Sequence, residues 1–317
     1  MGSGLLCFSG NDRPGREEKV MRYCLENETL RVEIDTHGAE IKSVVRKEDD
    51  TEYMWNGDPK YWGRTSPVLF PFVGAVRDKE YRHEGKTYAM GQHGFARDME
   101  FVRIENEETE QEHKLQMWFA LESNEETLQK YPFAFRLEIG YELSEDEITV
   151  HWNVKNPGDE TMYFSIGAHP AFRCPIRGEV DKTGYGLHFE GLKELHHHGN
   201  TPDGMAVMED EVLPLTDGNV FFKPGFFDKC TYMVEGKQTG EVSLLDTDGK
   251  PYVTVSFDAP LFAVWSPEKK DAPFVCIEPW YGRCDAVDFA GDLKERDYEQ
   301  TLAAGAGFQA EYRMKFR

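Results

Sequence analysis

From Met21 onward the sequence is dominated by the alternation of apolar and polar residues. Leu30, Val32 and Ile34 alternate with charged neighbours, and the same period of two occurs in four later runs. Those runs are Leu137–Leu143, Ile148–Val154, Val253–Phe257 and Tyr312–Phe316. A strand with this pattern buries one face and exposes the other, which is typical of antiparallel sheets. The pattern therefore predicts an all-β protein.

Turn residues separate the alternating runs at short intervals. Asp248-Gly249 lies between two such runs and predicts a hairpin, and Glu84-Gly85-Lys86 separates two shorter strands. Helix signals are few. Asn124–Gln129 predicts one short capped helix, and Leu293–Leu302 predicts a second.

The chain shows no linker and no internal repeat after its first residues. Residues 1–20 are rich in glycine and charge, and we expect them to be a disordered leader or a remnant of cloning. The segment His196–Met205 is the strongest loop candidate, but alternating runs lie on both sides of it. We therefore expect residues 21–317 to form a single β-sandwich domain.

The charge of the chain limits its partners. Its 58 acidic and 36 basic residues give a formal net charge of −22. This field repels nucleic acid phosphates and anionic membranes, so neither is an expected partner. No apolar run approaches the ~18 residues of a membrane span, and the first residues lack a secretory signal. The six cysteines form no C-x-x-C pair, which predicts reduced thiols in a cytoplasmic protein.

Three polar segments interrupt the alternation and carry the candidate chemistry. They are residues 91–98 (GQHGFARD), 165–172 (SIGAHPAF) and 276–280 (CIEPW). His169 follows an apolar run and has small neighbours that leave room for a ligand, and His93 lies in a glycine-flanked loop. Glu278 follows a strongly apolar strand, where burial raises the pKa of a carboxyl toward the range of a base working near neutral pH. Two histidines and one glutamate in such settings predict a general acid–base site.

At this point the sequence resembles a known family. The segments QHGFARD, GAHPAF and IEPW, in this order and at this spacing, are similar to those of the galactose mutarotase (aldose 1-epimerase) family. Leu30–Val45, Trp62–Gly74 and Phe226–Cys230 resemble it as well, so the resemblance runs from Met21 to Arg317. HGFAR with SPVLFPFVG is most similar to the bacterial mutarotase-like branch of lactose and tagatose operons. HGFAR also resembles the hexose-6-phosphate epimerase branch.

The resemblance implies a large antiparallel β-sandwich, with few short helices, that binds an aldose in a cleft on one sheet. Glu278 then matches the general base that takes the proton of the anomeric hydroxyl, and His169 matches the acid that protonates the ring oxygen. His93 matches a second, sugar-binding histidine, and Asp228 matches the acidic residue that holds sugar hydroxyls. Anomer interconversion by such a set is an isomerase reaction that needs no metal or organic cofactor.

One departure concerns the substrate. The family carries an arginine directly after the residue that matches Gly74, where this chain has Ala75. Either the loop is shifted, or Arg77, Arg64 or Arg97 replaces this arginine in sugar binding. Arg64 and Arg97 also resemble arginines that hold phosphate in the hexose-6-phosphate branch, so a phosphorylated aldose is an alternative substrate.

Two other readings remain open at this stage. One is a metal-dependent β-sandwich enzyme of cupin type with His93, His169 and Glu278 as ligands, although cupin histidines usually form a close H-x-H pair. The other is a sugar-binding protein without catalysis. The triplet His196-His197-His198 predicts an exposed loop end, not a metal site, because neighbouring side chains on a strand point to opposite faces. The acidic run Glu105–Glu112 predicts a solvated hairpin end.

Overall fold

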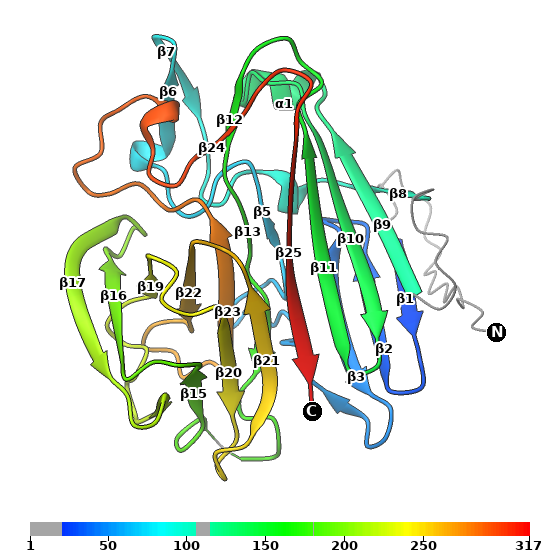
Figure 1. Ribbon diagram of the computed structural model, residues 1–317, viewed down its shortest axis with the longest axis vertical. Coiled ribbons are helices and arrows are strands. Elements are labelled where there is room, and N and C mark those ends of the chain that lie inside the picture. Colours follow the sequence, from blue (N-terminus) through cyan, green and yellow to red (C-terminus); the bar gives the residue numbers. More distant parts are fainter. Residues whose placement is uncertain (1–20, 106–114, 180) are drawn as a thin grey trace.

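The computed structural model describes residues 21–105, 115–179 and 181–317. The expected leader at residues 1–20 and nearly all of the acidic run Glu105–Glu112 lie outside these residues. Within them, nine strands form one antiparallel sheet (Figure 1). Their order is β18 (Asn219–Phe221), β15 (Gly186–Phe189), β20 (Glu241–Leu245), β21 (Pro251–Phe257), β25 (Gly307–Phe316), β11 (Glu147–Lys155), β10 (Arg136–Ser144), β9 (Leu115–Glu122) and β8 (Val102–Ile104).

A second sheet of eight described strands packs behind part of the first (Figure 1). Its path is β17 (Ala206–Pro214), β16 (Glu194–Asn200), β19 (Tyr232–Val234), β22 (Leu261–Trp265), β23 (Phe274–Tyr281), β13 (Ile166–Ala168) and β5 (Val68–Leu69), and β14 (Ala171–Arg173) also pairs with β23. The expected antiparallel β-sandwich is thus confirmed.

Smaller elements complete the described chain. They are the sheet of β1 (Arg22–Glu26), β2 (Leu30–Asp35), β3 (Glu40–Arg46) and β4 (Thr51–Glu52), the hairpin of β6 (Glu80–His83) and β7 (Lys86–Ala89), the pair β12 (Met162–Phe164) and β24 (Gln300–Leu302), the helix α1 (Glu125–Lys130), and the 3-10 turns Arg77–Lys79, Ala96–Asp98 and Leu293–Glu295. None of the helices in the described ranges has the length and hydrophobicity needed to cross a bilayer.

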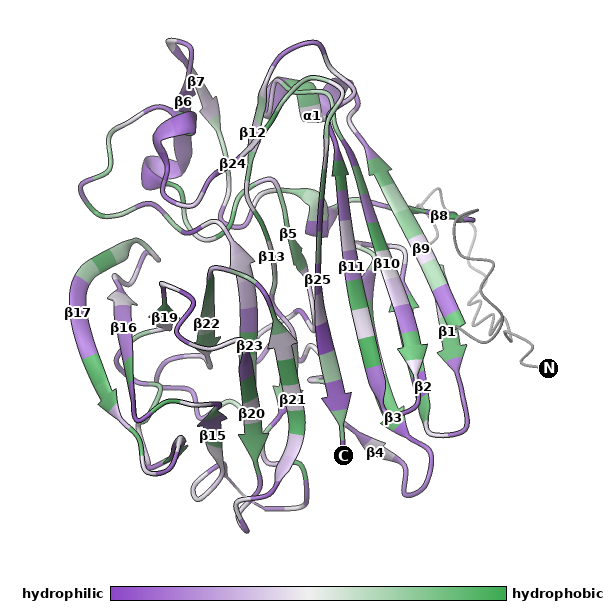
Figure 2. Cartoon of the chain, viewed as in Figure 1, coloured by the Kyte–Doolittle hydropathy of each residue, from purple (hydrophilic) through white to green (hydrophobic). Residues whose placement is uncertain are grey.

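The alternating apolar residues of the strands form the hydrophobic core between the two large sheets. Along β11 every second residue is buried, from Ile148 to Val154, and Figure 2 shows the alternating hydrophobic and hydrophilic bands on the neighbouring strands. Buried residues from both large sheets and from β2 and β3 form one continuous hydrophobic cluster, and the opposite face of the second sheet carries two smaller ones. On β23, Val275 and Ile277 point into this cluster, so the residues between them face the other side of the sheet.

The turn and helix predictions are largely confirmed. Asp248-Gly249 closes the hairpin of β20 and β21, and Glu84-Gly85 lies between β6 and β7. α1 begins after Asn124, whose side chain accepts from the Thr127 backbone N–H in a capping box.

The helix predicted over Leu293–Leu302 is wrong. Only Leu293–Glu295 forms a 3-10 turn, and the segment ends in the strand β24. The segment takes part in a buried ion network, in which Arg296 contacts Asp285 at 2.7 Å and Glu299 at 2.9 Å. Tyr298 has φ of 60°, which a right-handed helix does not allow.

The predicted loop at His196–Met205 is also corrected. Its first residues belong to β16, where His197 is buried and its neighbours His196 and His198 lie on the other face. The physical argument against a three-histidine metal site therefore holds on a strand, although the triplet is not an exposed loop end.

Candidate active site

Strand register brings His169 and Glu278 together. β13 and β14 both pair with β23, with Gly167 opposite Trp280 and Ala171 opposite Cys276. The same register on both sides of the break at His169-Pro170 places His169 across from Glu278. The His169 Nε2 lies 3.3 Å from the Glu278 Oε2. The sequence prediction that these two residues share a site agrees with this geometry.

Burial disfavours the charged form of both members of this pair. Glu278 is 1% exposed and His169 is 6% exposed. Desolvation raises the pKa of Glu278 well above its usual value, and the Trp280 indole opposes this rise. Desolvation, with a smaller effect from Arg97, lowers the pKa of His169 to about 3. Both shifts disfavour the charged form of the two groups, so proton exchange between them and a bound molecule needs little change in net charge.

His93 forms a second wall of the site. Its backbone has φ of 66°, and its ring lies edge-on to that of His169 with the centroids 5.5 Å apart. The Gly74 N–H donates a 3.0 Å hydrogen bond to the His93 Nδ1. This bond places the ring proton on Nε2. Burial lowers the pKa of His93 well below 6.5, so the ring is a neutral donor and not a cation.

Arg64 and Arg97 place positive charge beside the two histidines. Each arginine lowers the pKa of both His93 and His169 through its charge. Arg97 is mostly buried, and this burial lowers its own pKa to about 10. The Asp98 carboxylate lies 2.8 Å from the Arg64 Nη2 and 3.9 Å from the Arg97 Nε, so it offsets part of this charge.

Two of the expected sugar-binding residues make their contacts elsewhere. Arg77 donates to the Phe289 carbonyl at 2.8 Å and lines a separate hollow together with Arg82. Asp228 is exposed, accepts from the Lys269 backbone N–H at 2.9 Å, and lines a cavity of about 390 Å³ with Lys182. The structure shows no contact between either residue and the His169–Glu278 pair.

Ala75, the position of the expected family arginine, is buried. The turn that joins β16 to β17 covers it, since a Cβ on Gly204 would lie 3.2 Å from the Ala75 Cβ. A backbone turn therefore covers Ala75, and Arg64 and Arg97 are arginines whose charge acts on both histidines.

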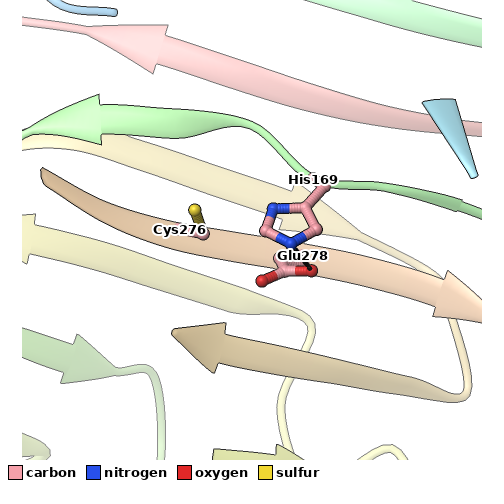
Figure 3. Close-up of side chains that lie close together, drawn as sticks. All are labelled: His169, Cys276 and Glu278. Atoms are coloured by element: carbon pink, nitrogen blue, oxygen red, sulfur yellow. Dashed lines mark ion pairs between the residues drawn. The ribbon is translucent and has the colours of Figure 1, made fainter. Parts of the chain in front are cut away.

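The sequence analysis did not assign three residues of the site. The Trp62 and Trp265 rings both pack on His169, with centroids 4.6 and 5.3 Å away. Cys276 lies on the same face of β23 as Glu278, two residues away (Figure 3). The alternation along β23 was the signal that could have found Cys276, whereas nothing in the sequence pattern places Trp62 against His169.

The described residues contain one group with metal-ligand chemistry, formed by His169, Cys276 and Glu278. One potential ligand atom from each lies within 4.8 Å of the other two. His93 does not belong to this group, so the ligand set of the cupin alternative differs from the one that the structure brings together.

Known proteins similar to this chain support the family that the quoted sequence segments indicate. The sequence profile of the aldose 1-epimerase family matches residues 21–315. The chromosomal LacX protein of Lactococcus lactis subsp. lactis is 29% identical over 281 residues, which are 86% of this chain and 91% of LacX. This similarity agrees with the bacterial branch expected from HGFAR and SPVLFPFVG.

Solved structures show the same relationship. A galactose mutarotase related enzyme from Lactobacillus acidophilus superposes with a TM-score of 0.85 and 34% identity, covering 94% of this chain and 97% of its own. A galactose mutarotase-like protein from Lactobacillus casei gives 0.83 and 29%, covering 93% of this chain and 100% of its own. The profile match over nearly the whole described chain decides the assignment: this chain belongs to the aldose 1-epimerase family.

Proposed function

We propose that this chain is an aldose 1-epimerase, a mutarotase that interconverts the α and β anomers of an aldose by acid–base ring opening. The observation that carries the proposal is the buried His169–Glu278 pair, 3.3 Å apart, in which burial disfavours the charged form of both groups. A pair of this kind can take a proton at one sugar oxygen and deliver one at another without creating net charge.

Ring opening uses one charge distribution of this pair. Glu278, as the carboxylate, accepts the proton of the C1 hydroxyl while His169, as the imidazolium, donates its Nε2 proton to the ring oxygen. The C1–O5 bond breaks, and the products are an open-chain aldehyde, a C5 hydroxyl, a neutral carboxyl and a neutral imidazole. Each positioned group of this type contributes about 10²–10⁴-fold to the rate.

Ring closure uses the other distribution. After rotation about the C1–C2 bond, Glu278 returns its proton to the aldehyde oxygen and His169 takes the proton of the C5 hydroxyl as the ring closes on the opposite face. The neutral form that burial favours in the free site is therefore also the form that closes the ring. Both protons return to their starting groups, and no metal or cofactor enters this balance.

The remaining residues suit binding. The neutral His93 can donate from Nε2 to a sugar oxygen, because its Nδ1 is already occupied by the Gly74 N–H. Arg64 and Arg97 can donate to sugar hydroxyls. Asp98 pairs with both and offsets part of their charge, which favours an uncharged aldose as the substrate.

A 6-phosphorylated aldose is the second candidate, because two guanidinium groups lie beside the histidines. A phosphate would have to compete with Asp98 for both of them. The sugar is thus a free or phosphorylated aldose.

The proposal is tested with protein treated with EDTA and then freed of it. Exchange NMR measures anomer interconversion for a panel of free and 6-phosphorylated aldoses, with Glu278→Gln as the matched control. We expect at least one aldose to interconvert faster with the wild type than with this variant. Activity that EDTA abolishes and Zn²⁺ or Mn²⁺ restores would favour the cupin-type mechanism, and binding without interconversion would favour a sugar-binding protein.

A further inference from the structure

Three side chains of different chemistry converge beneath the proposed sugar site. Cys276 and Glu278 are two residues apart on β23 and point to the same face of the sheet, and His169 lies across from Glu278 (Figure 3). Their potential ligand atoms lie within 4.8 Å of one another, and all three residues are buried. The acid–base reaction proposed above uses His169 and Glu278 but gives Cys276 no role.

The polar atoms of this cluster are incompletely satisfied. The Glu278 Oε2 and the His169 Nδ1 are buried and have no hydrogen-bond partner among the described residues. Buried polar atoms are almost always paired, so two orphans in one cluster indicate that the site is built to bind something. A sugar supplies partners for the Glu278 oxygen, but the addition of a sulfur donor is not a feature of sugar recognition.

Thiolate, imidazole and carboxylate are together the donors that Zn²⁺ binds in proteins. Ligand atoms about 2.0–2.3 Å from a tetrahedral zinc lie roughly 3.3–3.8 Å from one another. Atoms that lie within 4.8 Å of one another would therefore have to approach by up to about 1 Å to share one ion. The Cys276 thiolate and the Glu278 carboxylate together carry two negative charges, which balance the two positive charges of Zn²⁺. The filled site therefore has no net charge, which suits a buried position. Three protein ligands leave a fourth position open.

Some of the surrounding charges repel a cation and others attract it. Arg64 and Arg97 oppose the approach of a cation, although Asp98 pairs with both. The formal net charge of −22 attracts cations to the protein as a whole. The neutral charge of the filled site is therefore the feature that favours binding.

We propose that His169, Cys276 and Glu278 form a binding site for Zn²⁺, and that the ion inhibits anomer interconversion by occupying the acid and the base together. The inhibition rests on the proposed mutarotase function, whereas the ion site does not. In this protein zinc is an inhibitor and Cys276 is the residue that confers sensitivity to it.

The experiment separates the site from the activity. Protein freed of metal is titrated with Zn²⁺ by calorimetry, and with Co²⁺ by absorption spectroscopy, where a thiolate-to-cobalt charge-transfer band reports the sulfur ligand. We expect one ion per chain with this band in the wild type. Cys276→Ala should abolish the band and weaken binding by at least about 10–100-fold, the loss that follows removal of even an outer-shell partner.

Cys174→Ala is the matched control, because Cys174 is also fully buried but does not belong to the cluster. It should keep the band and the affinity of the wild type. Cys276→Ser provides a second variant of the same size, in case the alanine variant melts early. In the activity assay, Zn²⁺ should inhibit the wild type and Cys174→Ala but not Cys276→Ala.

Three other results would contradict one part of this proposal or of the proposed function. A wild type without the cobalt–thiolate band, or a Cys276→Ala variant that keeps it, overturns the ion site. The band together with Zn²⁺-insensitive activity overturns inhibition. The band in a protein that interconverts no aldose leaves the ion site standing and refutes the proposed function instead.

Discussion

The indole of Trp62 lies nearly flat on the imidazole of His169, with ring centroids 4.6 Å apart and an interplanar angle of 27°. The indole also stacks on Phe274, and the Trp55 Nε1 donates to the Trp62 carbonyl at 2.9 Å. A side chain held in this way fixes the plane of the imidazole and excludes water from one of its faces. Because the Nε2 edge stays directed at Glu278, Trp62 orients the proposed acid without blocking it.

This relationship predicts the effect of Trp62→Ala. Burial is the largest cause of the low pKa of His169, whose ring also faces Glu278, His93, Arg97 and Arg64. Removing the indole admits water, so the pKa of His169 rises toward 6.5. We expect kcat to fall by about 10-fold or more, because orientation is lost, and the acidic limb of the kcat–pH profile to move to higher pH.

The conservative variant and a distant control separate this role from general destabilisation. Trp62→Phe should restore most of kcat and the position of the acidic limb. Trp118 stacks on His151 in the nine-stranded sheet, with centroids 5.7 Å apart, so Trp118→Ala removes a similar contact away from the site. If Trp62→Ala only lowers the melting temperature, as Trp118→Ala is expected to do, the orienting role is wrong.

Local sequence patterns predicted most of the fold, because its strands are buried on one face. The period of two along Ile148–Val154 and the Asp248-Gly249 turn report directly on backbone geometry. The helix prediction for Leu293–Leu302 failed because the pairing of Arg296 with Asp285, a tertiary contact, overrides a local helix signal. The loop prediction at His196–Met205 failed because a buried His197 between an exposed and a half-buried histidine looks like a polar loop in the sequence.

For the candidate site, the sequence singled out residue types but not their arrangement. His93, His169 and Glu278 stood out by their settings, and the structure places them together. Arg77 stood out only by its nearness in sequence to Ala75, and a one-dimensional distance does not determine which way a loop turns. The alternation along β23 could have found Cys276, whereas Trp62 reaches His169 from a loop, and a single sequence does not state such a long-range contact.

The pKa of Glu278 predicts an effect of pH on stability. An unfolded glutamate has a pKa of about 4.3, and burial raises that of Glu278 above it. As the pH rises through this window the unfolded chain loses the proton and the folded chain keeps it, so the free energy of unfolding falls. Glu278→Gln removes this loss and should therefore stabilise the protein above pH 4.3, increasingly so up to the folded pKa.

Thermal melts at pH 4 and pH 8 measure this effect. A pKa rise of one pH unit corresponds to about 1.4 kcal/mol, or a rise in Tm of roughly 3–6 °C at the sensitivity of large domains. Glu138 is the matched control, because Arg136 and Lys155 lower its pKa, so Glu138→Gln should destabilise at pH 8. A Glu278→Gln variant that melts earlier than the wild type at pH 8 would make Glu278 a structural ion-pair partner.

Arg64 tests the charge of the substrate. If a 6-phosphate binds beside the histidines, Arg64→Ala should weaken binding of the phosphorylated aldose by at least about 10-fold and change that of the free aldose much less. Added salt should also weaken binding of the phosphorylated aldose more than binding of the free aldose, because salt screens the attraction between Arg64 and the phosphate.

Arg77→Ala is the control arginine, since its guanidinium bonds to the Phe289 carbonyl and lines another hollow. It should leave the preference between the two sugars unchanged. Calorimetry of both sugars at two salt concentrations gives the answer. Equal losses for the two sugars on Arg64→Ala would remove the case for phosphate recognition and leave the uncharged aldose as substrate.

The close approach of His169 and Glu278 predicts that the effects of substituting them are not independent. Glu278→Gln keeps the shape of the side chain but removes the proton acceptor, and His169→Asn removes the proton donor at the ring oxygen. Each single variant should lower kcat by at least about 10²-fold, with a smaller effect on sugar affinity. Because both groups act in one ring-opening step, the second substitution removes a group that has already lost its partner. The double variant should therefore lose much less than the product of the two single losses. Exchange NMR at saturating sugar measures all four proteins of this cycle. Single losses that multiply would mean that the two residues act in separate steps, and the concerted transfer proposed for this 3.3 Å pair would have to be abandoned.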